Sequence, residues 1–163
     1  MATKSYLHLT YKQGFPVGIR RNNPGNLRGK KGLYVGETVK PGGDTATGQT
    51  YYAFENMGYG MRAMIQLLLS RIMKSGCDTI TKLGKVYPAK SAAAEWVAAV
   101  SKNAGIKSTA KLDTDKTTIK KLALAIVRKE VGSPWRKAGV VASIDEQDFE
   151  EGWALLFPEP MIA

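Results

Sequence analysis

Apolar residues recur every three or four positions in the segment 113–132, and this spacing is the strongest constraint on the fold of the chain. It predicts an amphipathic helix whose apolar face is buried against the rest of the protein. That face carries Ile119, Leu122, Ala123 and Ile126. Glu130 follows on the same face, four residues after Ile126. A carboxyl group therefore stands where the pattern favours an apolar side chain.

Glu130 should be partly desolvated at the carboxyl end of this helix, just before Gly132. Burial and the negative end of the helix dipole both favour the neutral acid over the carboxylate. A glutamate that stays protonated near neutral pH can serve as a general acid. Two other interpretations stay open: the helix end frays and leaves Glu130 in solvent, or Glu130 forms an ion pair with Arg62 or Arg71.

Further apolar stripes predict that most of the remaining chain is helical. Helices are expected over 61–72 and 79–86, and a third one should run from a cap at Ser91 to Gly105. A last helix should start at Ser143-Ile144-Asp145-Glu146, which has capping-box spacing, and end before Pro158.

Two segments rich in β-forming residues, 34–39 and 49–54, predict a β-hairpin with the turn-rich connection 42–48. Residues 1–18 carry few helical signals and are expected to form an N-terminal extension, and the chain of 163 residues is expected to form one domain. The predicted class is therefore mainly α with a small β-hairpin.

The net charge and the scarcity of cysteine and histidine limit the classes of function that the chain can have. A formal net charge of +10 suits polyanionic partners such as nucleic acid, anionic lipid or cell-wall polymer. One cysteine, Cys77, and one histidine, His8, argue against a zinc site and against a Ser-His or Cys-His nucleophile. We expect no metal and no cofactor, which leaves carboxylates for catalysis. No apolar run has membrane-spanning length, and no signal peptide is evident, so synthesis as a cytosolic chain is expected.

The front of the chain carries an Asn-Pro-Gly-Asn turn that matches a known signature. The matching residues are Arg20-Arg21-Asn22-Asn23-Pro24-Gly25-Asn26-Leu27-Arg28, then Phe54 and Gly58-Tyr59-Gly60-Met61-Arg62-Ala63. They resemble the Arg-Asn-Asn-Asn-Pro-Gly-Asn-Ile-Arg signature of phage and prophage proteins that degrade peptidoglycan, either as virion components or as lytic factors. Many of those proteins have Glu-Asn-Asp-Thr where this chain has Ser91-Ala92-Ala93-Ala94, so no role of that glutamate carries over.

The segment 123–135 is similar to the end of the catalytic helix in lytic transglycosylases, where Glu-Ser-Gly precedes Asn-Pro. Here Val131 replaces the serine. The segment 22–28 and the hairpin after it also resemble bacterial wall glucosaminidases, in which the helix with the acid comes first. The resemblance implies that the order here is circularly permuted, which proteins tolerate where their termini lie close together on the surface. These resemblances imply a lysozyme-like α+β fold and cleavage of peptidoglycan glycan strands.

Glycosidic cleavage needs an acid and either a second carboxylate or help from the substrate itself. The resemblances place Glu130 as the acid and Glu37 as its partner in a hydrolase, with Asp44 as a second choice. A lytic transglycosylase would need Glu130 alone. Binding of acetamido sugars is assigned to Asn22, Asn23 and Asn26, although Asn in such a turn more often hydrogen-bonds its own backbone. Stacking on sugar faces is assigned to Tyr51 and Trp135. Trp96 is expected in the core.

Two other classes of function remain. Arg20, Arg21, Arg28, Lys30 and Lys31 lie in one loop-rich stretch, which suits a virion structural or nucleic-acid-binding protein without activity. A module that binds glycan without cutting it is the third interpretation. No motif for specific nucleic-acid recognition accompanies the basic stretch. A lytic protein would act in the cell wall or periplasm, or within the virion beside other phage proteins.

Overall fold

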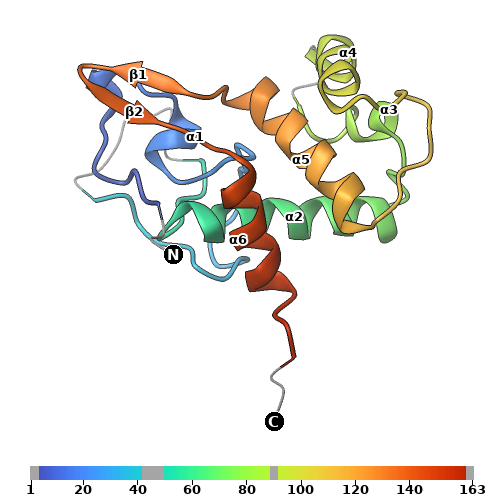
Figure 1. The fold of residues 1–163 in the computed structure, drawn as a ribbon, viewed down its shortest axis with the longest axis horizontal. Coiled ribbons are helices and arrows are strands. Elements are labelled where there is room, and N and C mark those ends of the chain that lie inside the picture. Colours follow the sequence, from blue (N-terminus) through green and yellow to red (C-terminus); the bar gives the residue numbers. More distant parts are fainter. Residues whose placement is uncertain (1–3, 42–49, 89–91, 161–163) are drawn as a thin grey trace.

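The computed structural model describes residues 4–41, 50–88 and 92–160. These residues form one domain of helices with a single two-stranded hairpin (Figure 1). The helices and strands are a 3₁₀ turn at Tyr11–Gln13, α1 (Val17–Arg20), α2 (Met57–Met73), α3 (Ile80–Leu83), α4 (Ala93–Ala104), α5 (Lys116–Glu130), β1 (Trp135–Lys137), β2 (Val140–Ala142) and α6 (Glu146–Leu156). The prediction of a mainly α domain with a small hairpin is confirmed.

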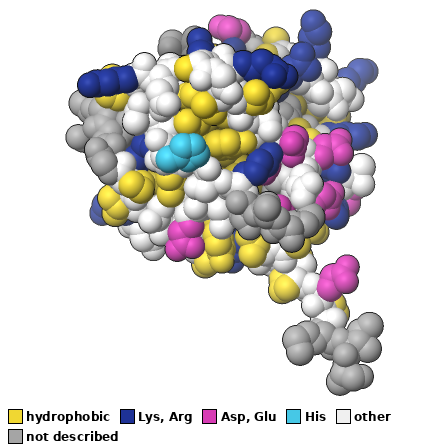
Figure 2. All heavy atoms as spheres, turned by 60° about the vertical axis from the view of Figure 1, so that its left-hand side comes forward, with side chains coloured by type: hydrophobic (Ala, Val, Ile, Leu, Met, Phe, Trp, Pro, Cys, Tyr) yellow, Lys and Arg dark blue, Asp and Glu magenta, His cyan; other side chains and the backbone are white. Residues whose placement is uncertain are grey.

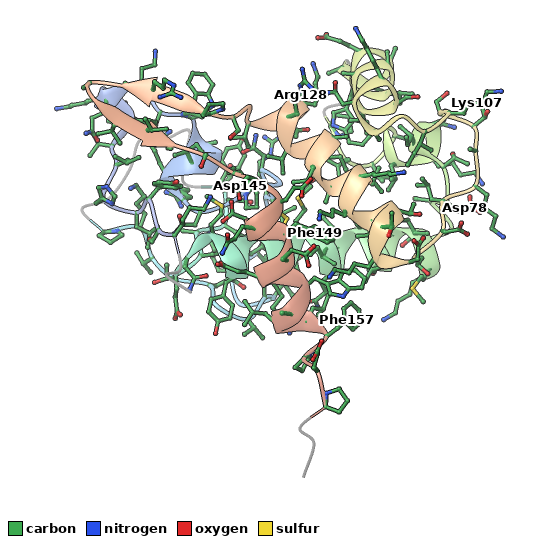
Figure 3. The ribbon with its side chains drawn as sticks, viewed as in Figure 1. Asp78, Lys107, Arg128, Asp145, Phe149 and Phe157 are labelled. Carbon is green, nitrogen blue, oxygen red and sulfur yellow. The ribbon has the colours of Figure 1, made fainter. Side chains whose placement is uncertain are left out.

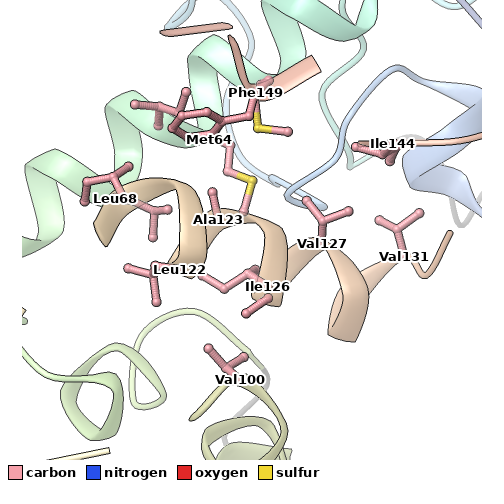
Figure 4. Packing of buried hydrophobic residues seen from close by; sticks show 14 of the residues in the cluster. Met64, Leu68, Val100, Leu122, Ala123, Ile126, Val127, Val131, Ile144 and Phe149 are labelled. Atoms are coloured by element: carbon pink, nitrogen blue, oxygen red, sulfur yellow. The ribbon is translucent and has the colours of Figure 1, made fainter. Parts of the chain in front are cut away.

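Helices α2, α5 and α6 surround the main core (Figure 4). Met64 and Leu68 of α2 meet Ala123 of α5 and Phe149 of α6 in this cluster, and all four are fully buried. Asp115 caps α5 by accepting a hydrogen bond from the Thr118 amide at 3.3 Å. Burial of this apolar face, together with the cap, is what stabilises α5.

Gly60 lets α2 lie directly against the Asn-Pro-Gly turn. A β-carbon at this position would come within 1.8 Å of the Asn22 carbonyl oxygen. Gly152 allows α6 to approach α2 in the same way, since its β-carbon would lie 2.8 Å from the Met61 side chain. These contacts fix the turn against the helical core.

The N-terminal segment differs from the extension that the sequence suggested. Leu9 and Phe15 are buried in the main core. Lys4 forms an ion pair at 2.7 Å with Asp148 of α6, whose side chain is completely buried. His8 lies on the surface with hydrophobic side chains around it (Figure 2). Leu9 and Phe15 thus anchor this segment in the core. The sequence did not predict this because the segment has no helical periodicity.

The start of α6 also differs in detail. Asp145, and not Ser143, is the N-cap: its carboxylate accepts the Gln147 amide at 3.1 Å. Asp148 completes the capping box by accepting the Asp145 amide at 2.8 Å. Phe149 lies in the first turn of α6, and Phe157 follows the helix where the chain leaves the domain (Figure 3). The expected cap at Ser91 of the earlier helix lies outside the described residues.

The hairpin is not where the sequence predicted it. The backbones of segments 34–39 and 50–54 pair through one isolated antiparallel bridge, between Glu37 and Phe54, and the Tyr34 ring contacts those of Tyr52 and Phe54. Most of the expected connection lies outside the described residues. Gly36 interrupts the first arm in a left-handed conformation (φ 83°), and a β-carbon there would lie 2.3 Å from the Tyr59 ring. A regular ladder therefore does not form there.

The strands that do form are β1 and β2, paired with Trp135 opposite Ala142. Their two-residue turn, Ala138-Gly139, has positive φ at both positions (49° and 76°), as the favoured hairpin turns of this length require. Alanine is a poor signal for that conformation, which is why the sequence pattern missed this hairpin. None of the helices in the described part of the chain is long and apolar enough to span a membrane.

Candidate functional site

A cleft of about 580 Å³ lies where the 26–34 loop, α2, the chain before α4, and the end of α5 come together. Its wall includes the aromatic residues Tyr34, Tyr51, Tyr52, Tyr87 and Trp96. Cationic residues Arg28, Lys30, Arg71 and Lys129 also line it. Glu130 is the one carboxylate among the described lining residues. The size and the aromatic wall suit a ligand as large as a short sugar chain.

Glu130 is the last residue of α5 and is held by two neighbours. The Trp96 indole Nε1–H donates to its Oε1 at 2.9 Å. The Asn26 amide Nδ2 donates to the Glu130 backbone carbonyl at 3.0 Å and to its Oε2 at 3.5 Å. These donors from α4 and from the turn fix the orientation of the carboxyl group at the cleft wall.

Neither alternative for Glu130 fits this arrangement. The helix end is intact, because the Val131 amide still donates to the Val127 carbonyl at 2.8 Å. Arg62 donates to Gln66 at 3.2 Å, and no described cation lies within ion-pair distance of Glu130. Glu130 is half-buried and hydrogen-bonded, as a positioned acid requires.

Trp96 was expected in the core and is indeed buried, with 1% of its surface exposed. Its ring stacks on Tyr87 at 5.4 Å, and the Tyr87 hydroxyl donates to the Gly25 carbonyl at 2.7 Å. Burial, and in second place the charge of Glu130, raise the pKa of Tyr87 well above its ordinary value. Tyr87 therefore stays protonated and holds the turn. The sequence holds one signal for the role of Trp96 as a donor: a buried tryptophan needs a hydrogen-bond partner for its indole N–H.

Asn22 and Asn23 do not reach the cleft. Asn22 is fully buried: its side chain accepts the Tyr6 amide at 2.9 Å and donates to the Phe54 carbonyl at 2.9 Å. Asn23 is 1% exposed and bonds both backbone groups of Leu27. The assignment of these two residues to sugar binding is therefore corrected, because their polar atoms are buried in the turn. Asn26 does line the cleft.

Glu37 holds the loop beside the cleft. Its carboxylate accepts the Gly32 amide at 2.9 Å and the Tyr34 amide at 2.6 Å. Leu33 and Tyr34 of this loop line the cleft, whereas Glu37 is not part of its described lining. Asp44, the second choice of partner for the acid, lies outside the described residues.

The two aromatic residues expected to stack on sugars, Tyr51 and Trp135, lie in different parts of the structure. Tyr51 lines the cleft, with the Arg28 guanidinium 5.1 Å from its ring centre. Trp135 stands on β1 and donates from its indole N–H to the Val131 carbonyl at 2.8 Å. Gly132, in a left-handed conformation (φ 78°), turns the chain away after α5. Trp135 is therefore a bracing residue of the hairpin and not part of the described cleft lining.

Searches with this chain match no protein-family model and no curated protein. The described residues also contain no group of three or more histidine, cysteine or acidic side chains placed to hold a metal ion. Function is therefore inferred from the cleft and its chemistry.

Proposed function

We propose that the protein cleaves the glycan backbone of peptidoglycan, with Glu130 as the general acid. The observation that carries the proposal is the Glu130 carboxyl group, held by Trp96 and Asn26 at the wall of an aromatic cleft. Aromatic rings such as that of Tyr51 offer flat apolar surfaces for sugar rings. The resemblance of segments 20–28 and 123–135 to wall-degrading enzymes supports the same activity.

The arrangement of carboxylates favours a mechanism with one acid. Glu130 would give its proton to the bridging oxygen as the bond from that oxygen to the anomeric carbon breaks. A hydroxyl group of the same sugar would then bond to the anomeric carbon and return its proton to Glu130. The product is a sugar with an internal anhydro ring. Glu37 has a structural task on the loop, which is why we place it outside the reaction.

Digestion of purified peptidoglycan, followed by mass analysis of the fragments, tests the proposal. We expect anhydro-sugar ends, which are lighter by one water than reducing ends. Reducing ends, together with inactivation by Glu37→Gln, would instead indicate a hydrolase with two carboxylates. A well-folded protein that releases no glycan fragments would overturn the proposed activity.

Trp96→Phe tests how Glu130 is held. Phenylalanine keeps a ring against Tyr87 but removes the indole donor to Glu130 Oε1. Glu130 becomes a carboxylate as it gives up its proton, and a hydrogen bond to a charged group contributes about 1.5–3 kcal/mol, so cleavage should fall by about 10- to 100-fold. Initial rates on peptidoglycan, compared with the thermal unfolding of both proteins, check this. An unchanged rate would show that the indole does not position the acid.

The competing proposal is a virion or nucleic-acid-binding protein. Its specific support is the cation-rich loop, where Arg28 lies over Tyr51 and Lys31 lies 5.0 Å from the centre of the Tyr52 ring. Such a surface would bind DNA through phosphates alone, so binding should be sequence-blind and weaken steeply with salt. Tight binding to one DNA sequence at physiological salt, without wall activity, would favour this class. If the lytic activity holds, we place its action in the cell wall, during phage lysis or genome entry.

A further inference from the structure

The cleft carries more positive charge than the cleavage of a neutral glycan needs. Arg28, Lys30 and Arg71 line it together with Glu130. Within the described residues, none of these three cations has a carboxylate within ion-pair distance. Like charges gathered in one cleft repel one another, and an anion inside it relieves that repulsion.

Several cations elsewhere in the domain do have carboxylate partners. Lys116 and Lys120 both pair with Glu150, and Lys129 at the cleft rim pairs with Glu95 at 2.9 Å. Arg28, Lys30 and Arg71 share one cleft without such a partner among the described residues. The pKa of Lys31, which lies over a tyrosine of the cleft wall, is lowered first by burial and then by the nearby Arg21 charge. Among the charges around Lys31, the Glu37 carboxylate acts on its pKa in the opposite direction and by less than Arg21.

We propose that the cleft selects glycans that carry an anionic group, a carboxylate or a phosphate, bound by Arg28 and Arg71. This inference rests on the proposed function and specifies the substrate of the same site. Guanidinium groups suit both anions because their paired N–H groups match two oxygen atoms at once. The Tyr51 ring supports the Arg28 guanidinium, and α2 supplies Arg71 near its end.

The charges also orient the substrate. The carboxyl end of α5, where Glu130 lies, makes one part of the cleft unfavourable for an anion because it is the negative end of the helix dipole. Arg28 and Arg71 come from other segments, the 26–30 loop and α2. A sugar with an anionic substituent would therefore bind with that substituent toward the arginines and away from Glu130. The enzyme would then cut at a defined side of the anionic sugar.

The test compares three glycan probes of equal length. One is an uncharged N-acetylglucosamine oligomer, one is a peptide-free wall glycan with free lactyl carboxylates, and one is the uncharged oligomer bearing phosphate groups. Binding is measured by calorimetry in a Glu130→Gln background, so that no probe is cut. Initial cleavage rates of the protein with Glu130 intact are measured on the same probes.

We expect at least one anionic probe to bind about tenfold or more tightly than the uncharged oligomer, with the difference falling at high salt. Replacing both arginines (Arg28→Gln with Arg71→Gln) should remove that difference, so that the anionic probes bind no more tightly than the uncharged oligomer. Arg128→Gln is the matched control, because Arg128 is an exposed arginine on α5 that does not line the described cleft (Figure 3). Which anionic probe gains affinity identifies the carboxylate or the phosphate as the group that is bound.

Equal binding of all three probes, unchanged by the double arginine variant, would overturn the inference. Cleavage of the uncharged oligomer in that case would leave the proposed activity standing. Failure of a folded protein to bind or cut any of the probes would overturn both. The same loss of affinity in Arg128→Gln would show a general effect of net charge and would also overturn the assignment to Arg28 and Arg71.

Discussion

Glu130→Gln is expected to lower the rate of glycan cleavage by about 100- to 10,000-fold, because it removes the only proton donor that we assign to the leaving oxygen. The protein should remain folded. The Gln amide has nearly the same shape as the carboxyl group, and its oxygen can still accept the Trp96 N–H that now bonds Oε1. Release of soluble fragments from purified peptidoglycan measures the rate, and thermal unfolding checks the fold.

The control is Glu55→Gln, which makes the same chemical change at an exposed position that is not part of the described cleft lining. Its cleavage rate should stay close to that of the unchanged protein. Normal activity in a folded Glu130→Gln variant would remove Glu130 from the mechanism, whatever its position. Equal losses in both variants would point to net charge as the cause.

The helices could be predicted from the sequence where periodicity and caps agreed. The segment around α5 is an example: the apolar residues from Ile119 to Ile126 and the Asp115 cap place its ends within a few residues. The hairpin at β1 and β2 could not be predicted, because it depends on positive φ at Ala138, which alanine rarely adopts. Gly139 next to it is a common turn residue, but by itself it does not predict a hairpin.

The site could be predicted only in part. Glu130 was identifiable because it breaks an apolar pattern within one helix. Its contact with Asn26 spans 104 positions of the chain, and no local pattern reports such a pairing. Asn22 and Asn23 hydrogen-bond the backbone, which is the commoner role of Asn in such a turn, and the sequence alone does not distinguish that role from sugar binding. Here α2 covers the turn, which Gly60 makes possible.

Asn23→Ala is expected to lower the free energy of unfolding by about 3 kcal/mol. The Asn23 side chain donates to the Leu27 and Tyr52 carbonyls, both at 3.0 Å, and accepts the Leu27 amide at 2.9 Å. Alanine would leave the Leu27 amide and the Tyr52 carbonyl without these partners, and each such buried group costs about 1–3 kcal/mol, whereas the Leu27 carbonyl still accepts the Tyr52 amide at 3.1 Å. Partial relaxation of the turn offsets some of this sum. Denaturant unfolding monitored by circular dichroism measures the change.

Asn103→Ala is the matched control, since Asn103 is an exposed residue of α4 and its loss should change stability by less than about 0.5 kcal/mol. Leu27 and Tyr52 both line the cleft, so the Asn23 side chain connects the two segments that shape one of its walls. We therefore expect Asn23→Ala to lower activity in proportion to the loss of folded protein. A variant of unchanged stability that no longer binds glycan would contradict this and return Asn23 to the role of a sugar ligand. The Asn23 amide is buried and already bonded to the backbone, so a ligand in the cleft cannot reach it. This favours a structural role of Asn23 in the cleft wall.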